Sequence, residues 1–493
     1  MTENVGEQAA ADIDELQTRN KIGRGRQRLD VPDSPLMERV LRWIVEHNIE
    51  HVHGPRKVDY KIDELVVLVL LRNGRPYIKP FIEHYFSLGV KHIVFLDNGS
   101  IDGTVEALQN YANVTVLRSR LPYKKYNVTL KQYLVERFGR GRWTLNPDMD
   151  ELFEYPYSDV VSLKALLRYL NENSYTAVVT HMLDMFPGTG LSADSPATEY
   201  EGLKELHRFY DISDVRTWDY REVGDIGNVV ANEQIEVLQG GVIQRIFRTS
   251  PLLTKHPLVF LDEQLTPHDL SDHWVGNARI ADFTGVFLHY KLSANLYGLV
   301  QREIEERKYI NRHGKYDKMH KVLAEAPSLL IKNDSSKELK NVNELVGTRF
   351  VSVSRQYMRF VESEAKRNGR YSEESWSERL FEAFFNARAE IADYGRKTRE
   401  LQKELRELRA EARSERAALK QELRAEARSE RAALKQELRA EVRSKRAALK
   451  RARNAEEQLK AIQSSKSWKT LAMFKGIRIG VRDVLGRLRS VIN

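Results

Sequence analysis

The stretch from His92 to Phe153 constrains the fold of this chain more than any other. It begins with a short apolar run that predicts a strand, and a polar turn over residues 97–104 follows directly. A second predicted strand, through Trp143, leads into an acidic turn over residues 146–151. Loops at the carboxyl ends of neighbouring strands form the ligand crevice of an α/β sheet, and paired carboxylates bind hard cations. The two turns therefore indicate a site for a nucleotide and a metal ion.

Alternating strand and helix patterns surround this stretch. Val66–Leu71 is an unbroken apolar run, which is typical of a strand buried on both faces of a parallel sheet. A predicted helix over 77–88 stops at Gly89, a residue suited to the left-handed position after a helix. Other strands are predicted at 92–96, 114–117, 142–145, 176–180 and 241–247, and other helices at 104–111, 128–138 and 163–170. Such alternation predicts an α/β fold with a doubly wound, mostly parallel sheet flanked by helices.

The chain has 493 residues, which is too long for one hydrophobic core. We therefore expect several parts, of which the first 33 residues form a flexible lead-in. The predicted parts are an N-terminal extension with a short helix (1–60), the sheet domain (61–295), a helical region (296–395), a coiled coil (396–463) and a basic amphipathic segment (464–493).

Some classes of protein are excluded by composition. The chain has no cysteine, so disulfides, thiolate zinc sites and a cysteine nucleophile are excluded. No run approaches the ~18 apolar residues that a membrane-spanning helix needs. Residues 1–16 are acidic and lack the apolar core of a secretion signal. We therefore expect a cytoplasmic protein, with at most a peripheral position at the inner face of a membrane.

The C-terminal fifth of the chain has a composition of its own. Residues 396–493 contain 28 Lys and Arg against 13 Asp and Glu, a charge of +15 that leaves −6 for residues 1–395 out of the net +9. A 15-residue unit occurs three times, as Arg409–Leu423, Arg424–Leu438 and Arg439–Arg453. Its Ala, Glu, Arg, Lys and Leu residues are strong helix formers, so the pattern predicts one long helix. Fifteen residues in four turns favour a nearly straight or right-handed supercoil.

The charges of this predicted helix indicate what it could pair with. Glutamates follow each other one turn apart, and so do basic residues, and like charges at that spacing repel each other within a single helix. A second copy could present the opposite stripe, so self-association through a coiled coil is one hypothesis, and a solvated single helix is the alternative. Residues 468–493 predict a basic amphipathic helix that contacts an anionic membrane or packs on the protein itself. The tail is nearly devoid of aromatic residues, which argues against a nucleic-acid partner.

Five residues at predicted strand ends are candidates for ligand binding. Asp148 and Asp150 could hold one cation that bridges the phosphates of a nucleotide, or could cap a helix or lie in water. Asp97 could accept hydrogen bonds from a base or ribose, or could close an Asx-turn over the next residues. Arg72 and Asn73 end the neighbouring strand, where base or phosphate contacts would converge; Arg72 could equally form a surface ion pair.

Four motifs in this order resemble a family 2-type glycosyltransferase. The resemblance is closest to the branch whose acidic motif reads Asp-x-Asp-Glu-Phe, and it covers roughly residues 62–290. The motifs are Leu68–Leu71 with Arg72-Asn73, Phe81–Tyr85 with Leu88–Val90, Leu96–Thr104, and Asp148–Phe153. The chain departs from the family at Gly74, where Glu is usual, and at Leu152, where Phe is usual.

The resemblance implies a GT-A fold, a nucleotide-diphosphate sugar as donor, and a Mn or Mg ion. It implies that Asp97, with Asn98 and Ser100 of the same turn, contacts the nucleoside. It also implies that Asp148 and Asp150 serve the metal and the diphosphate. His289 resembles a His-Tyr ending of this branch and would be a third metal ligand.

Inverting transfer needs a base near the acceptor hydroxyl. Acidic and histidine side chains of residues 262–273 lie where the family keeps that base; Glu263 is the first choice and His273 the second, with a structural hydrogen bond as the alternative for each. We thus expect a metal-dependent, inverting glycosyltransferase that acts on a glycan or other hydroxyl acceptor in surface or cell-wall polysaccharide synthesis. The alternatives are a coiled-coil scaffold with a degenerate transferase domain and a sugar nucleotidyltransferase, although no Gly- and Arg-rich nucleotidyl loop occurs early in the chain.

Overall fold

The computed structural model describes residues 35–192, 201–223, 227–307, 315–326, 328–348, 350–381, 425–426, 428–461 and 464. The chain divides into two compact units, Met1–Ala392 and Asp393–Asn493. The predicted lead-in, the first copy of the 15-residue unit and the amphipathic segment after residue 464 lie outside the described residues.

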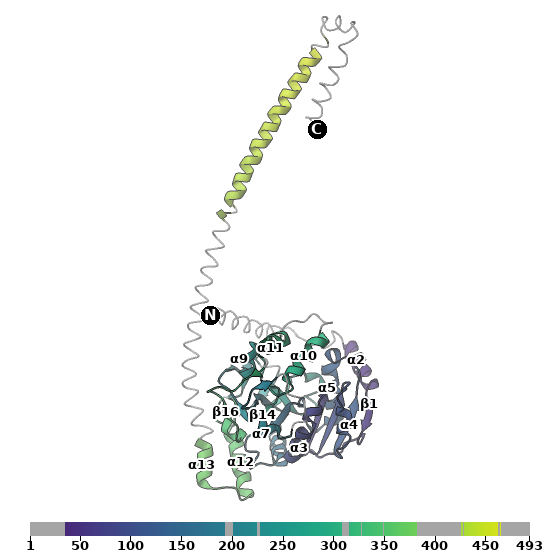
Figure 1. The fold of residues 1–493 in the computed structure, drawn as a ribbon, viewed down its shortest axis with the longest axis vertical. Coiled ribbons are helices and arrows are strands. Elements are labelled where there is room, and N and C mark those ends of the chain that lie inside the picture. Colours follow the sequence, from purple (N-terminus) through teal and green to yellow (C-terminus); the bar gives the residue numbers. More distant parts are fainter. Residues whose placement is uncertain are drawn as a thin grey trace. The chain divides into compact units, whose positions relative to one another are not determined.

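The first unit is built on a ten-stranded mixed sheet (Figure 1). The strands follow the order β1-β4-β3-β2-β5-β13-β7-β14-β11, and β6 also pairs with β14. Their bounds are β1 Glu50–His53, β2 Leu65–Leu71, β3 His92–Asp97, β4 Val114–Arg118, β5 Trp143–Leu145, β6 Glu151–Glu154, β7 Ala177–Asp184, β11 Val229–Val230, β13 Thr254–Phe260 and β14 Arg279–His289.

Most of these strands run in one direction. β2, β3, β4 and β5 are mutually parallel, and β14 is parallel to β7. β13 lies antiparallel to both β5 and β7, so those two strands also share a direction. The carboxyl ends of β2, β3, β4, β5, β7 and β14 therefore lie at the same edge of the sheet, called the carboxyl edge below. The predicted mostly parallel α/β fold is confirmed.

Helices cover both faces of the sheet. The helices before β14 are α2 Pro35–His47, η1 Arg75–Tyr77, α3 Ile78–Leu88, α4 Thr104–Leu108, α5 Tyr123–Gly139, α6 Leu163–Glu172, α7 Leu203–Leu206, α8 Tyr220–Val223, α9 Gly241–Phe247 and η2 Pro267–Asp269. Along β2, Val67 and Val69 pack in one core with side chains of α3, α4 and α6, whereas Val66 and Leu68 pack in a second core with α5. Burial on both faces explains the unbroken apolar run of this strand.

Helix α3 shows how closely local patterns predict local structure. Its buried face is formed by Phe81, Ile82 and Tyr85, and it ends at Gly89, whose φ of +99° is the left-handed conformation that favours glycine. α4 is shorter than predicted and ends at Leu108. α2 packs through Leu41 and Ile44.

The strand predicted over residues 241–247 is wrong, because this segment is helix α9. Its buried side chains are Val242, Ile243 and Phe247, a spacing of one and four residues that places them on one side of a helix. Gly240 and Gly241 both have positive φ, +98° and +69°, and they turn the chain sharply out of the preceding strand, β12 Glu236–Gly240. β12 pairs with β10 Val215–Asp219 outside the main sheet.

The region after β14 is helical in part. Its helices are α10 Leu296–Arg307, α11 Lys315–Glu325, η3 Val342–Leu345, α12 Arg355–Arg367 and α13 Glu373–Phe381. Two short strands interrupt them: β15 Ser328–Leu329 pairs with β8 Leu191–Ser192, and β16 Lys337–Glu338 pairs with β9 Phe209–Tyr210. Tyr357 and Val361 of α12 are fully buried in the core that contains β2. This region is therefore packed against the sheet domain.

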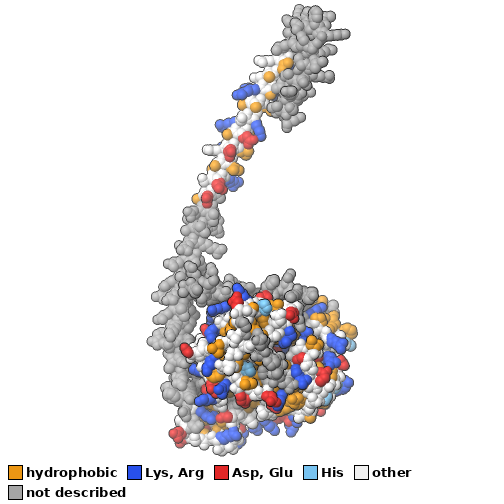
Figure 2. All heavy atoms as spheres, in the orientation of Figure 1, with side chains coloured by type: hydrophobic (Ala, Val, Ile, Leu, Met, Phe, Trp, Pro, Cys, Tyr) orange, Lys and Arg blue, Asp and Glu red, His pale blue; other side chains and the backbone are white. Residues whose placement is uncertain are grey.

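In the second unit, residues 428–461 form one long helix, as the repeats predict (Figure 1). Its side chains are mostly exposed, including Leu434 (71%), Leu438 (61%) and Leu449 (51%). Figure 2 shows hydrophobic side chains interleaved with charged ones along this helix. Ion pairs one turn apart, Glu441–Lys445 at 2.8 Å among them, stabilise it locally. No described helix is long and apolar enough to cross a bilayer.

Candidate active site

Strand pairing brings three distant ionisable residues into one row at the carboxyl edge. β6 pairs with β14 so that Glu151 lies opposite His289, and β14 pairs with β7 so that His289 lies opposite Asp184. Asp150 directly precedes this row, and its carbonyl oxygen accepts the Tyr290 N–H at 2.8 Å. The acidic turn and the ends of β7 and β14 thus form one cluster.

His289 lies between two carboxylates of this cluster. Its Nδ1 is 2.7 Å from Asp184 Oδ1, and its Nε2 is 3.6 Å from Asp150 Oδ2. Burial lowers the pKa of His289, but the two carboxylates outweigh burial and raise the pKa to about 9. Burial likewise raises the pKa of Asp150, but the adjacent positively charged His289 outweighs burial, so the net pKa is lowered. Asp184 was not predicted from the sequence, in which its one signal is an acid at the end of a strand that is otherwise largely apolar.

The pKa of His289 leads to a pH prediction. Its folded-state pKa of about 9 is above the ordinary 6.5, so this group stabilises the fold fully below pH 6.5, and the contribution is lost as the pH rises through 9. The shift corresponds to about 3 kcal/mol. In metal-free buffer, we expect the free energy of unfolding from urea titrations to fall by about that amount between pH 6 and 10. His289→Gln should flatten this dependence; an unchanged slope would contradict the assignment.

The residues Asp150 and His289 fit a divalent cation. Metal-bound histidines usually donate their second ring N–H to a carboxylate, which is the place of Asp184 here. No three His, Asp or Glu side chains among the described residues are gathered as a complete metal site. Mg²⁺ typically takes one or two carboxylates and completes its shell with water and substrate phosphates. Because its pKa is about 9, His289 would have to release its ring proton in order to hold the ion together with Asp150 and a bound diphosphate.

Asp148 has different neighbours. Its Oδ2 is 2.8 Å from the Lys255 ammonium, and its Oδ1 is 3.5 Å from that of Lys131. Lys255 also bonds Glu151 at 2.6 Å, and Lys131 bonds Asp272. Burial raises the pKa of Asp148, but the two lysines outweigh it and hold the pKa well below its usual range. Neither lysine was predicted from the sequence, since single lysines in a helix and a strand form no recognisable pattern.

The turn after β3 is held by the side chain of Asp97. Its carboxylate is 1% exposed and accepts the N–H groups of Gly99 and Ser100, each at 3.1 Å. Arg118 Nε lies 3.7 Å away. The structure therefore contains the Asx-turn that the sequence allowed. A nucleoside contact by Asp97 stays a prediction.

The loop after β2 is joined to this turn. The Asn73 N–H donates to Ser100 Oγ at 2.8 Å, and Asn73 Oδ1 accepts the Ile101 N–H at 2.9 Å. Asn98 instead donates to the carbonyl oxygens of Ser119 and Leu121, beside the start of α5. Asn73 and Ser100 thus fix the two loops to each other, and Asn98 fixes the turn to the next segment.

Gly74 brings the loop after β2 against the acidic turn. A Cβ atom at residue 74 would lie 3.2 Å from Met149 Cγ, so the Met149 side chain takes the space beside it. Arg72 is exposed at the same edge. The absence of a side chain at residue 74 therefore leaves room for Met149 of the acidic turn.

Helix α3 supports the strand that follows the acidic turn. The Tyr85 hydroxyl donates to the Glu151 carbonyl oxygen at 2.9 Å and accepts the Phe153 N–H at 3.1 Å. His84 Nε2 is 2.8 Å from the Phe153 carbonyl oxygen. The His-Tyr pair of the second motif thus has a structural role, which is to fix β6 and hence Glu151.

The structure separates the two candidates for the base. Glu263 is exposed and follows β13, whose end pairs with Trp143 at the start of β5. Lys255 lies at the other end of β13. Glu263 is therefore near the amino ends of the parallel strands, and the structure does not bring it together with Asp148.

His273 lies close to the lysine cluster. Burial lowers its pKa, the charge of Lys255 lowers it further, and the resulting value is about 3, although Asp272 and Asp148 act in the opposite direction. Its ring is therefore neutral at physiological pH. Its Nδ1 is buried without a hydrogen-bond partner in the described structure. Its carbonyl oxygen accepts two bonds from His256, which hold the backbone in place.

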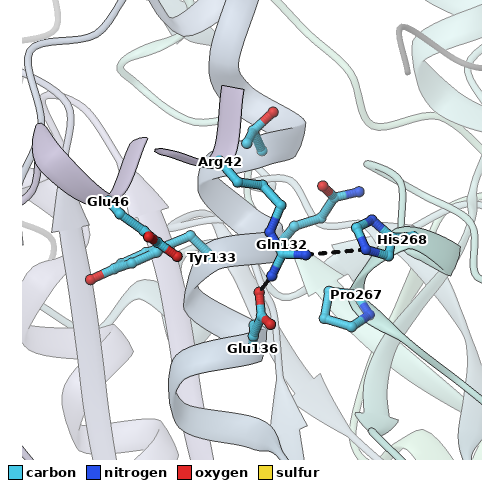
Figure 3. A pocket seen from close by; sticks show the side chains of 8 residues that line it. Arg42, Glu46, Gln132, Tyr133, Glu136, Pro267 and His268 are labelled. Carbon is cyan, nitrogen blue, oxygen red and sulfur yellow. Dashed lines mark hydrogen bonds and ion pairs between the residues drawn. The ribbon is translucent and has the colours of Figure 1, made fainter. Parts of the chain in front are cut away.

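A separate small hollow of about 10 Å³ lies between α2, α5 and η2 (Figure 3). Arg42 points into it between Glu136 and His268 and contacts both. Gln132 of α5 lines this hollow, whereas the neighbouring Lys131 points towards Asp148. The polar contacts of Arg42 join α2 to the domain, and they use none of the residues at the carboxyl edge.

A scan against protein-family models and a search of curated proteins both give no match. Solved structures that share similarity include a mannosyltransferase of Pyrobaculum calidifontis in complex with GDP-Man and Mn2+, with 18% identity and a TM-score of 0.19 over 28% of this chain. This chain spans 41% of the length of that protein. Others are a UTP-bound UGPase and a UDP-glucose pyrophosphorylase of Acinetobacter baumannii, with 11% and 10% identity, TM-scores of 0.17, and coverage of 54% of this chain and 84% of theirs. At these TM-scores, none of the likenesses supports an assignment.

Proposed function

We propose that this chain is a glycosyltransferase that moves a sugar from a nucleotide-diphosphate donor to a hydroxyl acceptor, with inversion, and that it requires Mn²⁺ or Mg²⁺. The observation that carries the proposal is the cluster at the carboxyl edge, where Asp150 and His289, backed by Asp184, adjoin loops that begin at Asn73 and Asp97. Open α/β sheets bind their ligands at this edge. A glycan in surface or cell-wall polysaccharide synthesis is the proposed acceptor.

Each group has a distinct part in this proposal. The ion held by Asp150 and His289 would neutralise negative charge on the departing diphosphate. Asp184 orients the imidazole, and the coupled loops at Asn73 and Ser100 receive the nucleoside end. Lys255 and Lys131 fix the Asp148 carboxylate, so the acidic turn is rigid before a ligand arrives.

We propose His273 as the base that deprotonates the acceptor hydroxyl. Its ring is neutral and can therefore accept a proton. A pKa of about 3 makes a weak base, but a diphosphate bound beside Lys255 would add negative charge nearby and raise that pKa.

The direct test is release of nucleotide diphosphate from a panel of nucleotide sugars, with Mn²⁺ and with EDTA, in the presence of candidate glycan acceptors. We expect nucleotide diphosphate to be released from at least one donor, and this release should depend on both the metal and the acceptor. If no donor is consumed and none binds, the chain is better described as a scaffold with a degenerate transferase domain.

We also propose that the long helix joins two copies of the chain, as the exposed Leu434 and Leu438 favour. Light scattering should report an oligomer for the full chain and a monomer for a chain ending at Gly395. The same oligomeric state for both would contradict this proposal. Contact of residues 464–493 with an anionic membrane stays a prediction, outside the described residues.

A further inference from the structure

We propose that the Lys255 ammonium takes the place of a metal ion between the carboxylates of Asp148 and Glu151. A divalent cation can then bind only on the side of Asp150 and His289. The role of the metal ion in this inference rests on the proposed function, but the contacts of Lys255 do not depend on it. It makes Lys255 a positioning residue and limits the site to one divalent ion.

The first support is that every oxygen of the two carboxylates has a donor. Asp148 Oδ2 and Glu151 Oε1 face Lys255 at 2.8 and 2.6 Å. Asp148 Oδ1 faces Lys131 at 3.5 Å, and Glu151 Oε2 accepts the Asp148 N–H at 2.9 Å. A metal ion that approached this pair would have to displace a donor or lie beside an ammonium group, which repels it.

The second support is that Lys255 is fixed in place. It lies in β13, where its backbone pairs with Thr180 of β7, and only 5% of the residue is exposed. Glu151 is 1% exposed and pairs with β14. Both residues are therefore almost completely buried, and the ion pair between them is shielded from solvent.

The third support is the contrast with Asp150. Its Oδ2 lies 3.6 Å from His289 Nε2, which is longer than an ordinary hydrogen bond. The carboxylates of the acidic motif therefore differ. Asp150 can still bind a cation, whereas Asp148 already has an ammonium group in that place.

The test measures Mn²⁺ binding by electron paramagnetic resonance and thermal shift, with Mn²⁺ alone and no nucleotide. Lys255→Met leaves Asp148 and Glu151 without their counter-ion. We expect this variant to melt at a lower temperature than wild type, to be restored in part by Mn²⁺, and to bind one more Mn²⁺ ion. Lys255→Arg keeps the positive charge and should not gain a site.

The matched control is the double variant Lys255→Met with Glu151→Gln, which removes one of the two freed carboxylates and should lose the extra site. If Lys255→Met is folded and gains no Mn²⁺, the inference is wrong. Asp150→Asn in an otherwise native chain gives a second test: it should bind no Mn²⁺, and a retained ion at Asp148 would overturn the inference. Because no sugar is involved, a failure of the proposed function would leave these results unaffected.

Discussion

Asp150→Asn is expected to lower the rate of sugar transfer by about 10³-fold or more, the loss that follows when a metal ion no longer stabilises the leaving group by several kcal/mol. Asparagine keeps the size of the side chain but removes the charge that faces His289 at 3.6 Å. The bond between His289 and Asp184 remains, so the fold around the site should persist. The measurement is nucleotide-diphosphate release at saturating Mn²⁺.

Asp334→Asn is a matched control for this variant. Asp334 is exposed in the segment between β15 and β16, and surface substitutions of this kind usually change stability by less than about 0.5 kcal/mol. It should therefore show wild-type turnover. If Asp150→Asn also shows wild-type turnover while folded, the ion is not held by Asp150.

His273→Gln is expected to lower kcat by about 10²–10⁴-fold, the usual contribution of general base catalysis. Glutamine can form hydrogen bonds but cannot take up the acceptor proton. KM for the donor should change little, since the proposed role of His273 is towards the acceptor and not the donor. The pH profile of kcat is the decisive readout, because the acid limb that reports the base should disappear.

Glu263→Gln provides the comparison for His273→Gln. Glu263 lies beyond the end of β13 that pairs with the start of β5, so we expect this variant to leave kcat within about twofold, as for other exposed substitutions. A large loss at Glu263 with wild-type activity at His273 would reverse the assignment.

The fold was predictable because its signals are local. The apolar run of β2, the glycine after α3 and the polar turn after β3 each reflect the burial or dihedral angles of a few adjacent residues. The segment of α9 was predicted incorrectly for the same reason. Its apolar residues are β-branched in part, and two glycines with positive φ decide its direction without changing its hydropathy.

The site was predictable only in part, since it depends on strand pairing across long separations. Asp150 and His289 lie close together because β6 pairs with β14. No local sequence pattern predicts this pairing. Lys255 reaches Asp148 because β13 runs antiparallel to its neighbours. The same reversal carries Glu263 away from the carboxyl edge. If every strand were parallel, neither the contact of Lys255 with Asp148 nor the distant position of Glu263 would be expected.

The central claim is that two loops and the Asp150–His289 pair at the carboxyl edge bind a metal-chelated nucleotide diphosphate. Its most direct measurement is a thermal-shift screen of nucleotide sugars against the full chain, each with Mn²⁺ and with EDTA. The account predicts that at least one nucleotide stabilises the protein only when Mn²⁺ is present, by about 2.7 kcal/mol when the ligand is at 100 times its Kd. Equal stabilisation with and without the metal, or none with any nucleotide, would contradict it.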